Sequence, residues 1–130
     1  MQMIFLEAMI VMGAEKSFEN KVKKFIEDSG GWYVKFFANR MTKKGIPDVL
    51  ACINGYFVGI EVKADNGKPS ELQKYHRAKI IKSGGISIVL YPADYELFKQ
   101  LVKYLNVDNF DIACDFAYRI NERSLWGESK

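Results

Sequence analysis

The dipeptide Asn54-Gly55 divides the middle of this chain into two short apolar segments. Asn-Gly is the strongest short-range signal for a two-residue type I′ turn, because both turn positions require a positive φ. We therefore expect the flanking segments to pair as the antiparallel strands of a β-hairpin. Both segments are apolar on both faces, as in Val49-Leu50 and Phe57-Val58, which is typical of buried central strands.

The hairpin determines where three charged residues lie. Ile53 faces Tyr56 across the turn, and counting outwards places Asp48 directly opposite Glu61, with Cβ atoms roughly 5 Å apart. Because side chains alternate along a strand, Lys63 lies on the same face as Glu61. Opposed and buried like charges destabilise a sheet unless they are neutralised. We therefore expect a divalent cation held by carboxylate oxygens, rather than a turn-capping Asp48 and a solvated ion pair on an edge strand.

The chain has 130 residues, enough for one domain with a substantial core. Its net charge of +3 is uneven: residues 14–44 carry eight Lys/Arg and four Asp/Glu, whereas residues 93–130 carry five and seven. The basic half adjoins the hairpin. This distribution favours a polyanionic substrate, although a solvated basic surface gives the same count.

Cys52 and Cys114 have no disulfide or zinc-ligand spacing, and we expect both to be reduced thiols in the cytoplasm. The segment 1–12 is apolar but short, contains Glu7, and lacks a basic leader and a cleavage site. We expect neither a signal peptide nor a membrane span.

The remaining segments predict the other elements. Apolar residues at helical spacing predict helices at 17–29, from 70 to about 83 and from 94 to 105, with weakly patterned helix up to 126. Aromatic and β-branched runs predict strands at 32–38 and 86–91. The order is αβββαβ followed by helices, which indicates the α/β class with a mixed β-sheet flanked by helices. The segment 1–13 is an extra helix or strand that packs on the domain or on a partner subunit.

These motifs resemble the PD-(D/E)xK nuclease superfamily, with Pro47-Asp48 as the PD element and Glu61-Val62-Lys63 as the ExK element. The runs GIPD, NGYFVGIEVK, GKPSELQ and SGG before ISIVLY are more closely similar to stand-alone virus-type replication-repair nuclease (VRR-NUC) domains, which are common in phages. The resemblance implies a restriction-endonuclease-like core. It also implies a single nuclease domain over 1–130, with the core at about 15–92, an N-terminal apolar extension at 1–13 and a C-terminal helical extension at 93–130.

The resemblance further implies a set of site residues. Asp48 and Glu61, with the main-chain carbonyl of Val62, would bind Mg²⁺ or Mn²⁺, and Lys63 would position and polarise the attacking water. This fits the preference of hard cations for oxygen ligands.

Two more residues have both a site and a structural interpretation. Glu19 resembles the metal-reaching carboxylate that these nucleases place on the first helix, but an acidic residue shortly after Ser17 is also favoured by the helix dipole, and Glu15 is a competing candidate. Gln73 resembles the glutamine that bonds a metal water or a phosphate, but Ser70 and Gln73 also form a capping box.

His76 is the only histidine, and we expect it on the surface or in contact with DNA. A single histidine argues against His-metal nucleases and against a Ser-His-Asp site. Basic side chains around the motif are candidates for phosphate contacts, each with a solvated cation as the alternative. They are Lys35, Arg40, Lys43, Lys44, Lys68, Lys74 and Arg77.

We therefore expect a Mg²⁺-dependent DNA endonuclease that acts on branched or structured DNA during phage or mobile-element replication or repair, in the cytoplasm of a bacterium or a phage-infected host cell. One alternative is a Holliday junction resolvase. An alternative of a different class is a DNA-binding module that keeps the fold without cleavage, against which the intact Asp48, Glu61 and Lys63 argue.

We also expect a homodimer, because two equivalent strands of a branched substrate are cut most simply by two sites related by a two-fold axis. The segments that exceed the minimal core are the candidate interface: Met3–Met12 and the tail around Phe110, Phe116, Leu125 and Trp126. The alternative is that both segments pack on their own subunit.

Overall fold

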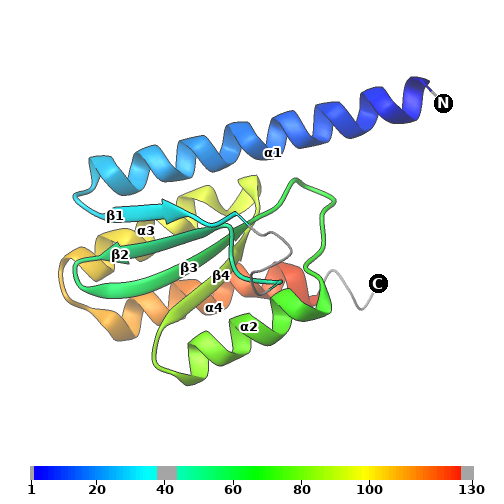
Figure 1. Ribbon diagram of the computed structural model, residues 1–130. Helices are drawn as coiled ribbons and strands as arrows, with labels where there is room; N and C mark the ends of the chain where they lie inside the picture. The colour runs from blue at the N-terminus through cyan, green and yellow to red at the C-terminus, as the bar shows by residue number, and fades with distance from the viewer. Residues whose placement is uncertain (1, 38–43, 127–130) are drawn as a thin grey trace.

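A four-stranded mixed sheet forms the centre of the computed structural model, which describes residues 2–37 and 44–126. The strands are β1 (Trp32–Lys35), β2 (Val49–Ile53), β3 (Tyr56–Val62) and β4 (Ile86–Leu90), in the spatial order β1-β2-β3-β4. The first three are antiparallel neighbours, and β4 runs parallel to β3. The predicted α/β class with a mixed, helix-flanked sheet is confirmed (Figure 1).

Helices cover the sheet unequally on its two faces. They are α1 (Gln2–Asp28), α2 (Glu71–Lys82), α3 (Tyr95–Asn106) and α4 (Phe110–Trp126), with a 3-10 turn η1 (Pro92–Asp94) before α3. Val49, Ala51 and Ile53 alternate along β2 and are buried with residues of α1 and α3 in the main core. α2 packs on the opposite face, against β3 and β4, so the alternate residues Leu50 and Cys52 of β2 are less buried.

The hairpin has the predicted turn and register. Ile53 pairs with Tyr56, and Asn54 and Gly55 both have positive φ angles, of 50° and 86°. These two angles identify the type I′ turn that Asn-Gly favours. The side-chain amide of Asn54 donates to the carbonyl of Leu105 at 2.8 Å, which ties the turn to the end of α3.

A buried amide covers the main chain of β4, which lies at one edge of the sheet. The N–H of Val89 donates to Oδ1 of Asn121 at 2.9 Å, and Nδ2 of Asn121 donates to the carbonyl of Ser87 at 2.9 Å. An unpaired buried peptide group is costly, so this polar side chain stabilises the contact between α4 and the sheet.

The first helix is longer than the predicted helix at 17–29, because α1 starts at Gln2 and continues through Gly13 without a break. Its apolar side chains at Ile4, Phe5, Leu6, Met9, Ile10, Val11 and Met12 are 50–73% exposed. This half of the helix projects beyond the sheet (Figure 1). The alternative in which this segment packs on its own subunit does not fit these exposed side chains, and the expected dimer contact stays a prediction.

The C-terminal helices pack within the chain, which fits the alternative to a dimer contact for part of the tail. Phe110 stacks on Tyr56 with ring centroids 5.2 Å apart, and Phe116 stacks on Tyr104 at 5.7 Å. These two aromatic residues contribute to the subunit's own core, whereas Leu125 is exposed. The side chain of Trp126 lies outside the described residues.

Within the described ranges, none of the helices combines the length and the apolar character that crossing a membrane requires.

Candidate active site

Asp48 and Glu61 lie opposite each other at the open end of the hairpin. The ladder between β2 and β3 ends with Val49 paired to Ile60, and these two carboxylates occupy the next position. The N–H of Asp48 donates to Oε2 of Glu61 at 3.1 Å, and the N–H of Val62 donates to Oδ2 of Asp48 at 3.2 Å. Each carboxylate is thus oriented by the main chain of the opposite strand, and the predicted pairing of the two positions is confirmed.

Lys63 is on the same side of the hairpin, as alternation predicts. Its Nζ lies 3.8 Å from Oε1 of Glu61. The N–H of Lys63 donates to the carbonyl of Leu90 at 3.1 Å, so pairing with the end of β4 continues to this residue. The backbone of Lys63 is thereby held by the sheet next to Glu61.

Gln73 forms the predicted capping box and also contacts the carboxylate pair, whereas its contact with a metal water or a phosphate stays a prediction. Oγ of Ser70 accepts from the N–H of Gln73 at 3.2 Å, and Oε1 of Gln73 accepts from the N–H of Ser70 at 2.8 Å, which is a complete capping box. The other side-chain atom, Nε2, donates to Oε1 of Glu61. The start of α2 is therefore connected directly to the carboxylate pair.

Burial makes both carboxylates difficult to ionise together. Removal from water, followed by repulsion from Asp48, raises the pKa of Glu61 to about 8. Removal from water also raises the pKa of Asp48, while the nearby Lys35 ammonium opposes that shift. A buried carboxyl group and a half-buried one that repel each other are the arrangement that a bound cation relieves.

The available ligands suit a cation that retains several waters. In the part of the chain that the structure describes, no three His, Cys, Asp or Glu side chains gather closely enough to hold a metal by themselves. Asp48, Glu61 and the carbonyl of Val62 would supply oxygen ligands, and water would complete the shell. Mg²⁺ is commonly bound through one or two carboxylates in this way, so the residues present fit it.

Lys35 occupies a position that the sequence does not predict. Its Nζ lies 2.6 Å from Oε1 of Glu19 and 3.8 Å from Oδ1 of Asp48, so it bridges the helix carboxylate and the hairpin carboxylate. Lys23 adds a second cation to Glu19 at 3.4 Å. Lys35 is thus part of the charged cluster, whereas the sequence suggests only a phosphate contact.

The two candidate helix carboxylates contact different parts of the site. Glu19 is buried and paired with Lys35, and its charge contributes to the raised pKa of Asp48. Glu15, one turn earlier, accepts from the N–H of Ala64 at 3.3 Å, and its charge contributes to the raised pKa of Glu61. Both residues therefore face the cluster, and neither directly contacts Asp48 or Glu61 through a hydrogen bond.

The other predicted phosphate contacts are distributed around the site. Lys44 and Lys68 are exposed, Lys74 forms an ion pair with Glu71 at 3.1 Å, and Arg77 donates to Ser124 at 2.9 Å. Arg77 thus connects α2 to α4. Arg40 and Lys43 lie outside the described residues.

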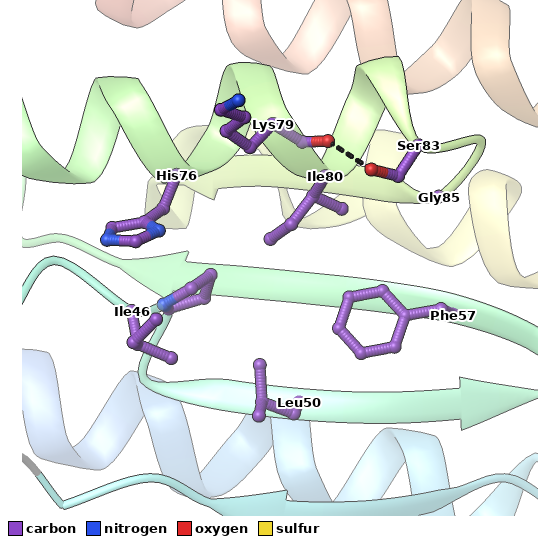
Figure 2. A pocket seen from close by; sticks show the side chains of 9 residues that line it. Ile46, Leu50, Phe57, His76, Lys79, Ile80, Ser83 and Gly85 are labelled. Carbon is purple, nitrogen blue, oxygen red and sulfur yellow. Dashed lines mark hydrogen bonds between the residues drawn. The ribbon is translucent and has the colours of Figure 1, made fainter. Parts of the chain in front are cut away.

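His76 lies one turn after Gln73, at a groove between α2 and the hairpin. The groove has a volume of about 420 Å³ and is lined mainly by apolar side chains, including Leu50, Phe57 and Ile80 (Figure 2). The His76 ring packs edge-on against Tyr75, with centroids 5.2 Å apart. The sequence does not predict this groove, because it depends on how α2 packs over the sheet.

In the described residues a mixed sheet is flanked by helices, with Pro47-Asp48 directly before β2 and Glu61-Val62-Lys63 at the end of β3. A solved structure described as a VRR_NUC domain is similar to this chain, with a TM-score of 0.53 and 24% identity over 70% of this chain and 92% of that one. No family model and no curated protein matches the sequence. The match confirms, at the level of the fold, the resemblance to VRR-NUC domains that the motifs indicate.

Proposed function

We propose that the chain is a Mg²⁺-dependent endonuclease that hydrolyses phosphodiester bonds in DNA, with Mn²⁺ as an alternative metal. The observation that carries this proposal is the pair of opposed carboxylates, the half-buried Asp48 and the buried Glu61, with Lys63 beside Glu61. A sheet has no structural use for such a pair, since like charges directly opposite each other are destabilising.

Each residue around the pair has a role in this proposal. When bound by Asp48, Glu61 and the Val62 carbonyl, Mg²⁺ would supply stabilisation of phosphate charge and a more acidic water. Lys63 holds a positive charge close to the position where the phosphate develops negative charge, and it orients the attacking water. Gln73 fixes one oxygen of Glu61 through its hydrogen bond, which keeps that carboxylate aligned.

Branched or otherwise structured DNA is the substrate we propose, in phage or mobile-element replication or repair. The fold of the matching VRR_NUC domain and the basic character of residues 14–44 support a nucleic acid. A Holliday junction resolvase remains the closest alternative. The two cysteines are free thiols, which supports a reducing compartment such as the cytoplasm.

A cleavage assay with linear, gapped, flapped and four-way DNA tests the proposal. The full-length protein should cut at least one substrate with Mg²⁺ and none in EDTA. Asp48→Asn and Lys63→Ala should abolish cleavage while the circular dichroism spectrum stays unchanged. Glu96→Gln on the exposed side of α3 is the matched control and should cut normally. Normal cleavage by Asp48→Asn would refute the mechanism, and DNA binding without cleavage by the wild type would indicate the binding module.

We also propose a homodimer that forms through the projecting half of α1. Seven large apolar side chains there are 50–73% exposed, and an exposed apolar patch of this kind marks a protein–protein contact. Phe5→Lys or Ile10→Lys in the full-length chain should convert a dimer to a monomer in light scattering. Val107→Lys, which changes an exposed apolar residue after α3, is the control. A monomeric wild type at tens of micromolar would reject the dimer.

A further inference from the structure

One face of the sheet continues from the carboxylate pair to two exposed aromatic rings. Cross-strand partners share a face, so the register defines successive rows of side chains. Beyond Asp48 and Glu61, the second row is Val34, Leu50 and Gly59, and the third is Trp32, Cys52 and Phe57. Rows on one face are two residues apart, so the third row lies about 14 Å from the carboxylates.

This face is apolar, and it is uncovered on the β1 and β2 side, where Trp32 and Cys52 are exposed. Trp32 is 64% exposed and Phe57 is 44% exposed, and α2 packs only over the β3 and β4 side. The groove between α2 and the hairpin lies on this face, with Leu50 and Phe57 on the hairpin side and Ile80 on the helix side (Figure 2). Gly59 in the second row is buried, because a Cβ there would lie 3.0 Å from the side chain of Pro47 and 3.4 Å from that of Ile80. The open part of this row is Val34, which is 42% exposed.

The charges around the groove are mainly positive. α2 contains four Lys/Arg and one Glu, a net charge of +3, and Lys79 and His76 line the groove itself. Lys63 and Lys35 lie at the end where the carboxylates are. Cationic side chains beside exposed aromatic rings are the combination that binds single-stranded nucleic acid, because the backbone is attracted and the bases stack.

We propose that this face binds unpaired nucleotides of the strand whose phosphate lies at Asp48 and Glu61, with bases stacking on Phe57 and Trp32. The inference rests on the proposed function and adds the kind of DNA that the site accepts. At the 3.4 Å rise of a stacked strand, 14 Å corresponds to about four nucleotides. A volume of about 420 Å³ is within the range of ordinary ligand pockets and can hold a nucleotide.

Binding measurements with Ca²⁺ in place of Mg²⁺ test this inference without requiring turnover. The probes are a fluorescent duplex with a single-stranded tail and a fully paired duplex of the same length. Trp32→Ala, Phe57→Ala and Phe57→Leu should each weaken binding of the tailed DNA about 5- to 100-fold and change binding of the duplex little. Tyr118→Ala, an exposed aromatic residue on α4, should change neither.

A second DNA probe measures how much base stacking contributes to binding. When the tail carries abasic sites, wild type and Phe57→Ala should bind it equally, because there is no base left to stack. Equal binding of normal tails by wild type and by all three variants would overturn the inference. It would also be overturned if the variants changed the oligomeric mass in light scattering, which would assign the face to a protein contact.

The binding and cleavage experiments distinguish a failure of this inference from a failure of the proposed nuclease function. If the wild type prefers tailed DNA through Trp32 and Phe57 but cuts nothing with Mg²⁺, the inference holds and the proposed cleavage fails. If cleavage is normal in Trp32→Ala and Phe57→Ala on tailed substrates and binding is unchanged, the cleavage proposal stands and the inference fails.

Discussion

Replacement of Glu61 by Gln should stabilise the metal-free protein at alkaline pH. The carboxyl of Glu61 is buried opposite Asp48, and these two causes raise its pKa from 4.5 to about 8. The amide of Gln has nearly the same shape as a protonated carboxyl group and carries no charge at any pH. The substitution therefore removes the cost of ionising Glu61 in the folded state.

The raised pKa of Glu61 determines both the direction and the size of the change in the free energy of unfolding. Between pH 4.5 and about 8 the folded protein retains a proton on Glu61 that the unfolded chain has lost, so the free energy of unfolding falls as the pH rises. A shift from 4.5 to about 8 corresponds to about 5 kcal/mol at most. Water entry and small movements of the two carboxylates reduce this cost, and we expect about 2–3 kcal/mol, or roughly 10 °C in Tm.

Thermal unfolding in EDTA at pH 5 and at pH 9 measures the effect. Wild type and Glu61→Gln should melt at similar temperatures at pH 5, and the variant should be the more stable at pH 9. Glu96→Gln, an exposed carboxylate, should follow the wild type. Mg²⁺ should raise the Tm of the wild type at pH 9 more than that of Glu61→Gln. A Glu61→Gln variant that is less stable than the wild type at pH 9 would refute the reasoning and indicate a structural ion pair with Lys63.

Three further outcomes are expected. Ca²⁺ should support DNA binding without cleavage, because its larger and looser shell aligns water and phosphate poorly, and binding should weaken steeply with salt when followed by anisotropy. Ser70→Ala should lose about 1 kcal/mol of stability in denaturant titrations and still cleave. Gln73→Ala should lose a similar amount and also cleave more slowly, because Gln73, unlike Ser70, donates a hydrogen bond to Glu61. Asn121→Ala should lose about 2–4 kcal/mol by calorimetry, because it leaves the main chain of β4 unpaired.

The sequence predicts the hairpin well because its determinants are local. The Asn54-Gly55 turn sets the register, and the register alone places Asp48 opposite Glu61. The capping box at Ser70 and Gln73 likewise lies within four residues and marks the start of α2 correctly. These contacts depend on turn geometry and alternation, which a single sequence carries.

The rest of the site depends on packing between distant segments. Lys35 reaches Asp48 and Glu19 because α1 and β1 pack beside the hairpin, and no spacing in the sequence encodes that arrangement. Glu15 and Glu19 are four residues apart and share one side of α1, so the pattern alone leaves both as candidates. Both face the cluster in the structure, Glu15 toward Ala64 and Glu19 toward Lys35.

The start of α1 is the clearest disagreement between the sequence and the structure. The prediction began the helix at Ser17, because the stripe of apolar residues at helical spacing starts with Phe18. The residues before Gly13 are mostly good helix formers, such as Met, Leu, Ala and Glu, and the helix continues through the glycine. An interior glycine costs only about 1 kcal/mol, which a long helix tolerates.

The continuity of α1 links assembly to the chemistry of the site. A 27-residue helix is about 40 Å long, and its projecting half is rigidly joined to the turns that carry Glu15 and Glu19. A subunit that binds the projecting half therefore fixes the direction of the helix axis. Small rotations of that axis would move Glu15 relative to Ala64 and Glu19 relative to Lys35. Dimer formation would then change the positions of the Glu15 and Glu19 carboxylates, and with them the electrostatic environment of Asp48 and Glu61.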